Sequence, residues 1–180
     1  MKSQIGNLNR ISLSLIKNTI KGEDETKIED KYKKFTTSLT EINNCIYNVT
    51  RGKSKCNGLS RLKKIQSELS SGFLKTDVSN VNRQYIINAR IEIDKTISSL
   101  KYINNLVYPA TQVIIKNECK IEQLNKELQN LDKKIKCNKS NVNVITKRRT
   151  SKLHELNNLK EQNDRLKENV HGYISTLKNS

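Results

Sequence analysis

Residues 28–49 read IEDKYKKFTTSLTEINNCIYNV, and the spacing of apolar side chains in this stretch sets the expectation for the whole chain. These side chains recur at alternating intervals of four and three residues, at Ile28, Tyr32, Phe35, Leu39, Ile42, Ile46 and Val49. Such alternation is the heptad pattern, which lays one narrow apolar stripe along a long helix. The stretch therefore predicts a helix whose seam, Tyr32, Phe35, Leu39, Ile42 and Ile46, packs against another long helix.

The composition of the chain extends this expectation to the rest of the sequence. Of its 180 residues 34% are hydrophobic and 4% aromatic, and it contains no Trp, 6 Gly and 1 Pro. The large side chains of sheet cores and the turn residues that separate many short strands are therefore both scarce. The remaining apolar residues fall three and four apart among polar ones, which is typical of amphipathic helices. The sequence predicts an all-α fold.

The first part of the chain is expected to form a bundle of about four helices over residues 1–108. The first helix ends near Gly22, and a loop with two glycines and three cations, 51–58, follows the helix that carries the seam. A shorter helix covers 59–73, and a fourth, capped by Asp77 or Ser79, continues to the single proline. Pro109 cannot continue the backbone ladder, so the sequence predicts that this helix and the domain end there.

Residues 110–180 are expected to form a long antiparallel coiled-coil hairpin. Two heptad stripes flank a polar segment, 138–145, that suits a turn. In an antiparallel pair the numbers of facing residues have a constant sum, and a sum of about 284 pairs apolar positions with one another. It places Leu131 opposite Leu153, Leu128 opposite Leu156, Ile121 opposite Asn163 and Ile114 opposite Val170. The predicted seam of the hairpin comprises Ile121, Leu124, Leu128, Leu131, Leu153, Leu156, Leu159 and Leu166.

A parallel dimer of each stripe is the competing arrangement, because a single Asn at a core position can fix the register of a dimer. Asn117 and Asn163 both fall within the stripes. The short polar segment favours the hairpin, since it tethers the two stripes to each other at high effective concentration.

The chain is strongly basic, with 34 Lys and Arg against 18 Asp and Glu and a formal net charge of +16. This excess indicates an acidic partner: a protein, a nucleic acid or an anionic membrane face. The densest cluster lies between residues 133 and 152, which hold eight cations and no acid. We call these eight residues the basic tip, because the predicted hairpin gathers them at its turn. They are Lys133, Lys134, Lys136, Lys139, Lys147, Arg148, Arg149 and Lys152.

The sequence offers no pattern for catalysis, a metal or a cofactor. Cys45, Cys56, Cys119 and Cys137 form no closely spaced pair of the kind that binds zinc, and both histidines lie far from them. No glycine-rich phosphate loop is present, and neither His154 nor His171 has a Cys, Ser or carboxylate partner identifiable by motif. We therefore expect no catalytic, cofactor-binding or metal-binding residues.

The absence of a signal-peptide core and of a long apolar run favours an intracellular protein, cytoplasmic or nuclear, without a transmembrane segment. Residues 1–22 carry four cations and no acid on an amphipathic pattern, so a mitochondrial presequence is the alternative to a first structural helix.

These features together predict a non-enzymatic scaffold or adaptor subunit of a larger assembly, in homo- or hetero-oligomeric contact with other protein subunits. Its heptad seams would pack against another chain, and the basic tip would contact an acidic surface. The alternative is a nucleic-acid-binding or packaging protein in which the charge itself is the function.

Overall fold

The computed structural model describes residues 1–49, 58–75, 80–137 and 141–179, and every element in these ranges is helical. The expected all-α fold is confirmed. The chain divides into two compact units, which we call unit 1, Met1–Asn105, and unit 2, Leu106–Ser180. Among the described residues no helix is both long enough and apolar enough to cross a membrane.

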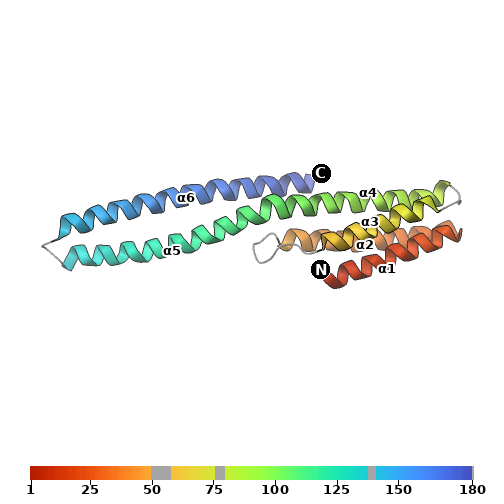
Figure 1. The fold of residues 1–180 in the computed structure, drawn as a ribbon, viewed down its shortest axis with the longest axis horizontal. Helices are drawn as coiled ribbons and strands as arrows, with labels where there is room; N and C mark the ends of the chain where they lie inside the picture. The colour runs from red at the N-terminus through yellow and green to blue at the C-terminus, as the bar shows by residue number, and fades with distance from the viewer. Residues whose placement is uncertain (50–57, 76–79, 138–140, 180) are drawn as a thin grey trace. The chain divides into compact units, whose positions relative to one another are not determined.

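The described residues of unit 1 form the α-helices α1 (Lys2–Ile20), α2 (Glu25–Val49), α3 (Leu59–Leu74) and α4 (Asn80–Tyr102) (Figure 1). Helix α1 contacts α2 and α3, and α4 closes the bundle by contacting the same two helices. α1 and α3 are therefore neighbours, and α2 and α4 form the other pair. The predicted loop at 51–58 and the predicted caps Asp77 and Ser79 lie outside the described residues, except for Gly58.

The turn between α1 and α2 follows from its local sequence. Gly22 has φ of 65°, a left-handed conformation that suits glycine because it has no Cβ. Two residues later Asp24 accepts hydrogen bonds at 3.0 Å from both the backbone amide and the hydroxyl of Thr26. An acceptor at the start of a helix satisfies amides that lack an intrahelical partner, so α2 begins here.

The predicted seam on α2 lies in the core of unit 1. Phe35, Leu39, Ile42 and Ile46 are at most 3% exposed. Tyr32 is half-buried, and its ring lies 5.5 Å from that of Tyr85 on α4. In this structure the seam packs against helices of the same chain.

The prediction that a helix ends at Pro109 is wrong. α4 is followed by a π-helix, Ile103–Val107, and then directly by α5, Tyr108–Cys137, so helical backbone runs through the proline. A proline inside a regular α-helix loses one hydrogen bond and collides with the carbonyl four residues earlier. The π turn immediately before Pro109 is wider than an α turn, which gives the proline ring more room, although the ring nitrogen still donates no hydrogen bond. The Thr111 hydroxyl then donates to the Val107 carbonyl oxygen at 2.8 Å.

Unit 2 consists of α5 and α6, Val142–Asn179, which pack against each other in antiparallel directions (Figure 1). Its core is a small apolar cluster of Leu124, Leu128 and Leu156, with Ile121 and Leu159 packed on it. Two helices that bury a narrow stripe leave most of their side chains in solvent, and the chemistry of unit 2 therefore lies on its surface.

The register of α5 and α6 differs from the predicted one. The Asn163 side chain lies against the backbone of Ile114, about two helical turns from its predicted neighbour Ile121. The reason lies at the turn. α6 already begins at Val142, where the Ile145 amide bonds to the Asn141 carbonyl at 3.2 Å, whereas the prediction kept the segment to residue 145 non-helical. Asn is a favoured residue just before a helix, so α6 begins at Val142 and not after residue 145.

Candidate functional site

The described members of the basic tip lie at the two helix ends that flank the turn of unit 2. The last turn of α5 carries Lys134 and Lys136, with Lys133 just before it, and the first turns of α6 carry the others. Lys139 lies outside the described residues. Because α5 and α6 are antiparallel and contact each other, the structure brings these two groups of cations to one end of the unit.

Almost all the excess charge of unit 2 lies at this end. Residues 133–152 hold eight cations and no acid. The remaining residues of the unit, 106–132 and 153–180, hold seven cations and eight acids, and are therefore close to neutral. A compositional bias toward Lys along the chain would have left an excess along both helices, so the distribution points to a localised feature.

Two members of the basic tip are already paired with carboxylates of α5. Arg149 forms an ion pair with Asp132, and the Lys152 amine lies 3.2 Å from Glu127 and 3.5 Å from Glu155. The hydrogen bond from Glu127 raises the pKa of Lys152 above its ordinary value. These two residues therefore join α5 to α6 within the chain, and they offer less charge to a partner than the sequence suggested.

Sequence reasoning missed Asp132 and Glu127 because both precede the acid-free window, Asp132 directly and Glu127 by six residues. Charge complementarity in the sequence could have revealed them. A hairpin that brings Arg149 near Asp132 and Lys152 near Glu127 pairs opposite charges at both positions. The charge pattern was thus a better guide to register than the leucines, which can pair in more than one alignment.

The other five described members are exposed, and none forms an ion pair with a described residue; they are Lys133, Lys134, Lys136, Lys147 and Arg148. We call them the open cations. Lys134 of α5 and Arg148 of α6 line the same shallow hollow, of about 180 Å³, together with Glu127, Asn130 and Leu131. The hollow is where cations from the two helices approach each other across the α5–α6 surface.

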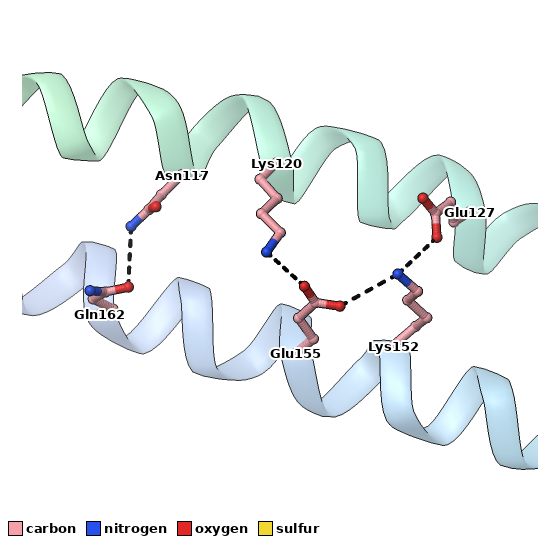
Figure 2. A network of polar contacts seen from close by, with 6 residues as sticks. All are labelled: Asn117, Lys120, Glu127, Lys152, Glu155 and Gln162. Atoms are coloured by element: carbon pink, nitrogen blue, oxygen red, sulfur yellow. Dashed lines mark hydrogen bonds and ion pairs between the residues drawn. The ribbon is translucent and has the colours of Figure 1, made fainter.

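Away from the tip, ion pairs and amides connect α5 and α6 at intervals. Lys120 pairs with Glu155 at 2.7 Å, and Lys167 pairs with Glu118 at 2.8 Å. Figure 2 shows Glu155 between Lys120 and Lys152, with the Asn117 amide donating to Gln162 at 3.4 Å farther along the helices. The hydrogen bond from Lys120 lowers the pKa of Glu155 below its ordinary value, so this carboxylate stays charged at neutral pH.

The predicted hairpin seam is mostly buried between α5 and α6. Leu124, Leu128, Leu131 and Leu156 are at most 8% exposed, and Ile121, Leu159 and Leu166 are half-buried. Leu153 differs: it is 37% exposed, and so it is not the buried counterpart of Leu131 that the predicted register required. Its neighbours on α6, Arg149 and Lys152, are the residues that pair with carboxylates of α5.

The described residues provide no constellation for metal binding, since no group of three or more His, Cys, Asp or Glu side chains converges within them. Cys45, Cys119 and Cys137 are free thiols, and the Cys45 thiol lies 3.3 Å from the Gln4 side-chain oxygen. The His154 ring contacts Asn158 at 3.2 Å on the exposed side of α6. The candidate site is therefore a charged surface, formed by exposed cations at one end of the paired helices α5 and α6.

Comparison of the chain with protein-family models, with curated proteins and with solved structures found no match in any of the three.

Proposed function

We propose that this chain is a non-enzymatic scaffold or adaptor subunit that docks the basic tip of unit 2 onto an acidic surface of a protein partner. The observation that carries the proposal is the contrast between the two parts of unit 2. Outside the tip, cations and acids balance, and the pairs Lys120–Glu155 and Lys167–Glu118 join the two helices. At the tip, five cations are exposed and form no ion pair with a described residue.

The open cations act together, because Lys133 and Lys134, like Lys147 and Arg148, are consecutive residues. The Debye length at physiological salt is about 8 Å, so the fields of neighbouring open cations add, whereas those of more distant charges are screened. A concentrated positive field accelerates encounter with a negatively charged partner and orients it. The paired residues Arg149 and Lys152 add a second property, because they fasten the two helix ends that carry the field.

The alternative function is nucleic-acid binding, which the same open cations favour because phosphates are also neutralised by exposed Lys and Arg. The two proposals differ in salt dependence and in the ligand preferred. A nucleic-acid binder retains affinity for generic duplex at about 0.15 M salt, with a slope that reflects several neutralised phosphates.

The experiment compares two charge-reversal pairs matched in number, sign and helix. Lys134→Glu with Arg148→Glu removes one open cation from each helix at the tip. Lys116→Glu with Lys160→Glu removes one exposed cation from each helix away from the tip; neither residue forms an ion pair with a described residue. Binding is measured by fluorescence anisotropy at about 0.15 M salt. The probes are a labelled polyglutamate peptide and a labelled duplex of about 20 base pairs.

The adaptor proposal predicts that the tip pair weakens polyglutamate binding about tenfold or more, and that the control pair weakens it less than about threefold. If both pairs weaken polyglutamate binding equally, the net charge of the chain and not the tip governs binding, which contradicts the proposal. Stronger binding of duplex than of polyglutamate, with a steep salt slope, would select the nucleic-acid alternative. Native mass spectrometry of the purified protein gives a separate decision, because a stable heteromer supports an adaptor and co-purifying nucleic acid supports the alternative.

A further inference from the structure

A second surface with a distinct character lies on unit 1, where α1 and α3 run against each other. A groove of about 250 Å³ is open between them. Its apolar side is formed by Leu13, Ile16 and Ile20 of α1, and its other side by the small residues Ser67, Ser71 and Gly72 of α3. Leu13 is 45% exposed and Ile20 41% exposed, although both belong to a helix whose opposite face is fully buried.

The shape of the groove matches one helix. Leu13, Ile16 and Ile20 have the spacing of one helical face, and they extend over about two turns. The small side chains of Ser67 and Ser71 keep the α3 side of the groove low, while the space beside Gly72 is already filled by Ile16. Leu74, the last residue of α3, is 81% exposed. An amphipathic helix laid into a groove between two helices presents residues at the same intervals.

The two helices that form the groove carry an excess of positive charge. Helices α1 and α3 with their terminal residues Lys21 and Lys75 carry eight cations and one carboxylate, whereas α2 and α4 carry eight cations and six carboxylates. The single carboxylate, Glu68, lines the groove and has Lys64 3.9 Å away. Lys75 lines the groove, and Lys17 lies on the same face of α1 as Leu13 and Ile20 by helical spacing. Both lysines are exposed, and neither forms an ion pair with a described residue.

We infer that the α1–α3 groove binds an acidic amphipathic helix of a partner protein. Apolar residues of that helix would cover Leu13, Ile16 and Ile20, while its acidic flanks would meet Lys17 and Lys75. A second copy of this chain is a poor occupant, since the same basic surfaces would face each other and the chain carries +16. A flat membrane fits a concave groove less well than a helix does, because the lipid surface leaves the floor uncovered.

The test uses the full chain and a designed probe. The probe is a fluorescein-labelled peptide of about 18 residues, with leucines at helical spacing on one face and glutamates elsewhere. A scrambled peptide of the same composition has equal charge but no apolar face. We expect the amphipathic peptide to bind at least about tenfold more tightly than the scrambled one. Equal binding would mean that only diffuse charge is recognised and would overturn the inference.

Two pairs of variants locate the binding. Leu13→Gln with Ile20→Gln should weaken binding of the amphipathic peptide about tenfold or more, whereas Val81→Gln with Ile91→Gln, on exposed apolar residues of α4, should change it less than about twofold. All four positions are exposed, so the variants should keep the helix content measured by circular dichroism. If both pairs have the same effect, the peptide does not occupy the groove.

Charge reversals complete the test. Lys17→Glu with Lys75→Glu should weaken peptide binding, whereas Lys34→Glu with Lys101→Glu, on α2 and α4, changes the net charge equally and should have little effect. The tip pair, Lys134→Glu with Arg148→Glu, should leave binding unchanged, which separates this inference from the proposed function.

Two other occupants would be recognised by their own readouts, and either result would overturn the inference. If anionic phospholipid vesicles bind the chain and the Leu13→Gln, Ile20→Gln pair abolishes that binding, the occupant is a membrane. If sedimentation shows a dimer that the same pair converts to a monomer, the occupant is a second copy.

Discussion

The side-chain amide of Asn163 on α6 donates a hydrogen bond to the backbone carbonyl oxygen of Ile114 on α5, at a distance of 3.4 Å. Asn163 is 2% exposed, and one turn away from Ile114 the buried Asn117 donates to Gln162. A polar side chain inside an apolar interface costs free energy unless it is paired, so it favours the one alignment in which its partner is present. We interpret Asn163 as a residue that fixes register.

Asn163→Leu tests this interpretation. The Asn163 oxygen Oδ1 is buried and has no hydrogen-bond partner among the described residues, which carries a desolvation cost. Replacing the amide by an apolar group of similar size should therefore raise the free energy of unfolding by about 1 kcal/mol. At the same time the register should become less unique. Chemical denaturation measures the first effect and cross-linking between cysteines placed on α5 and α6 the second. A loss of stability with an unchanged register would contradict the interpretation.

The glycines Gly72 and Gly172 provide a matched pair for testing the packing of unit 1. A Cβ on Gly72 would lie 2.6 Å from Cγ2 of Ile16, whereas a Cβ on Gly172 would meet nothing within 4 Å. Gly72→Ala should therefore cost about 1–3 kcal/mol, because the branched Ile16 side chain has little freedom to move. Gly172→Ala should stabilise the chain by about 0.5–1 kcal/mol, since it only reduces the freedom of the unfolded backbone. Thermal unfolding distinguishes them, and a stable Gly72→Ala variant would show that α1 and α3 are not in close contact.

The pairing of α5 with α6 should weaken in acid. The hydrogen bond from Lys120 lowers the pKa of Glu155 below its ordinary value of 4.5. The stabilisation that this carboxylate provides is therefore complete above about pH 4.5 and is lost as the pH falls through the lowered value. The pKa values of Lys152 and Lys167 are raised above 10.5, so their contribution is lost only in strong alkali.

The measurement is the fall in the melting temperature between about pH 6 and pH 3. Glu155→Gln should show a smaller fall than the unsubstituted chain, because the variant has no charge to lose at this position. Identical falls would mean that Glu155 contributes nothing to the pH dependence.

Asp132→Asn should increase the charge available at the basic tip. The substitution removes the carboxylate that pairs with Arg149 and leaves the guanidinium open to a partner. Association with an acidic ligand such as polyglutamate should become faster and more dependent on salt, by about one additional charge. Stopped-flow kinetics over a range of salt concentrations measure the change. Glu122→Gln, which removes a carboxylate paired with Lys126 on the exposed side of α5, is the control and should have less effect. A slower association for Asp132→Asn would show that the ion pair matters more for holding the helix ends together.

Part of this structure was predictable from the chain because it depends on local spacing. The intervals from Ile28 to Ile46 predicted a helix with one buried face, and α2 buries Phe35, Leu39 and Ile42 as that spacing requires. The run of cations from Lys133 to Lys152 is equally local, since it is read directly from consecutive positions.

The course of the helix through Pro109 and the register of α5 and α6 depend on contacts that sequence patterns do not show. Pro109 would end an ordinary helix, but a π turn accommodates it and the helical backbone continues into α5. The partner of Asn163 was misplaced because several alignments bury leucines about equally well, and the polar contact between Asn163 and Ile114 forms in only one of them.

The sequence by itself determined that the chain is helical and where its charges are concentrated, because helix periodicity and charge are properties of neighbouring residues. Only the tertiary structure decided which of those charges remain open. Asp132 and Arg149 are 17 residues apart, and they become a pair only when α5 and α6 lie side by side in one register. The same holds for the groove between Leu13 and Ser71, which exists only because α1 and α3 pack as neighbours. Long-range pairing depends on the sum of many weak contacts, and no single stretch of the chain contains that sum.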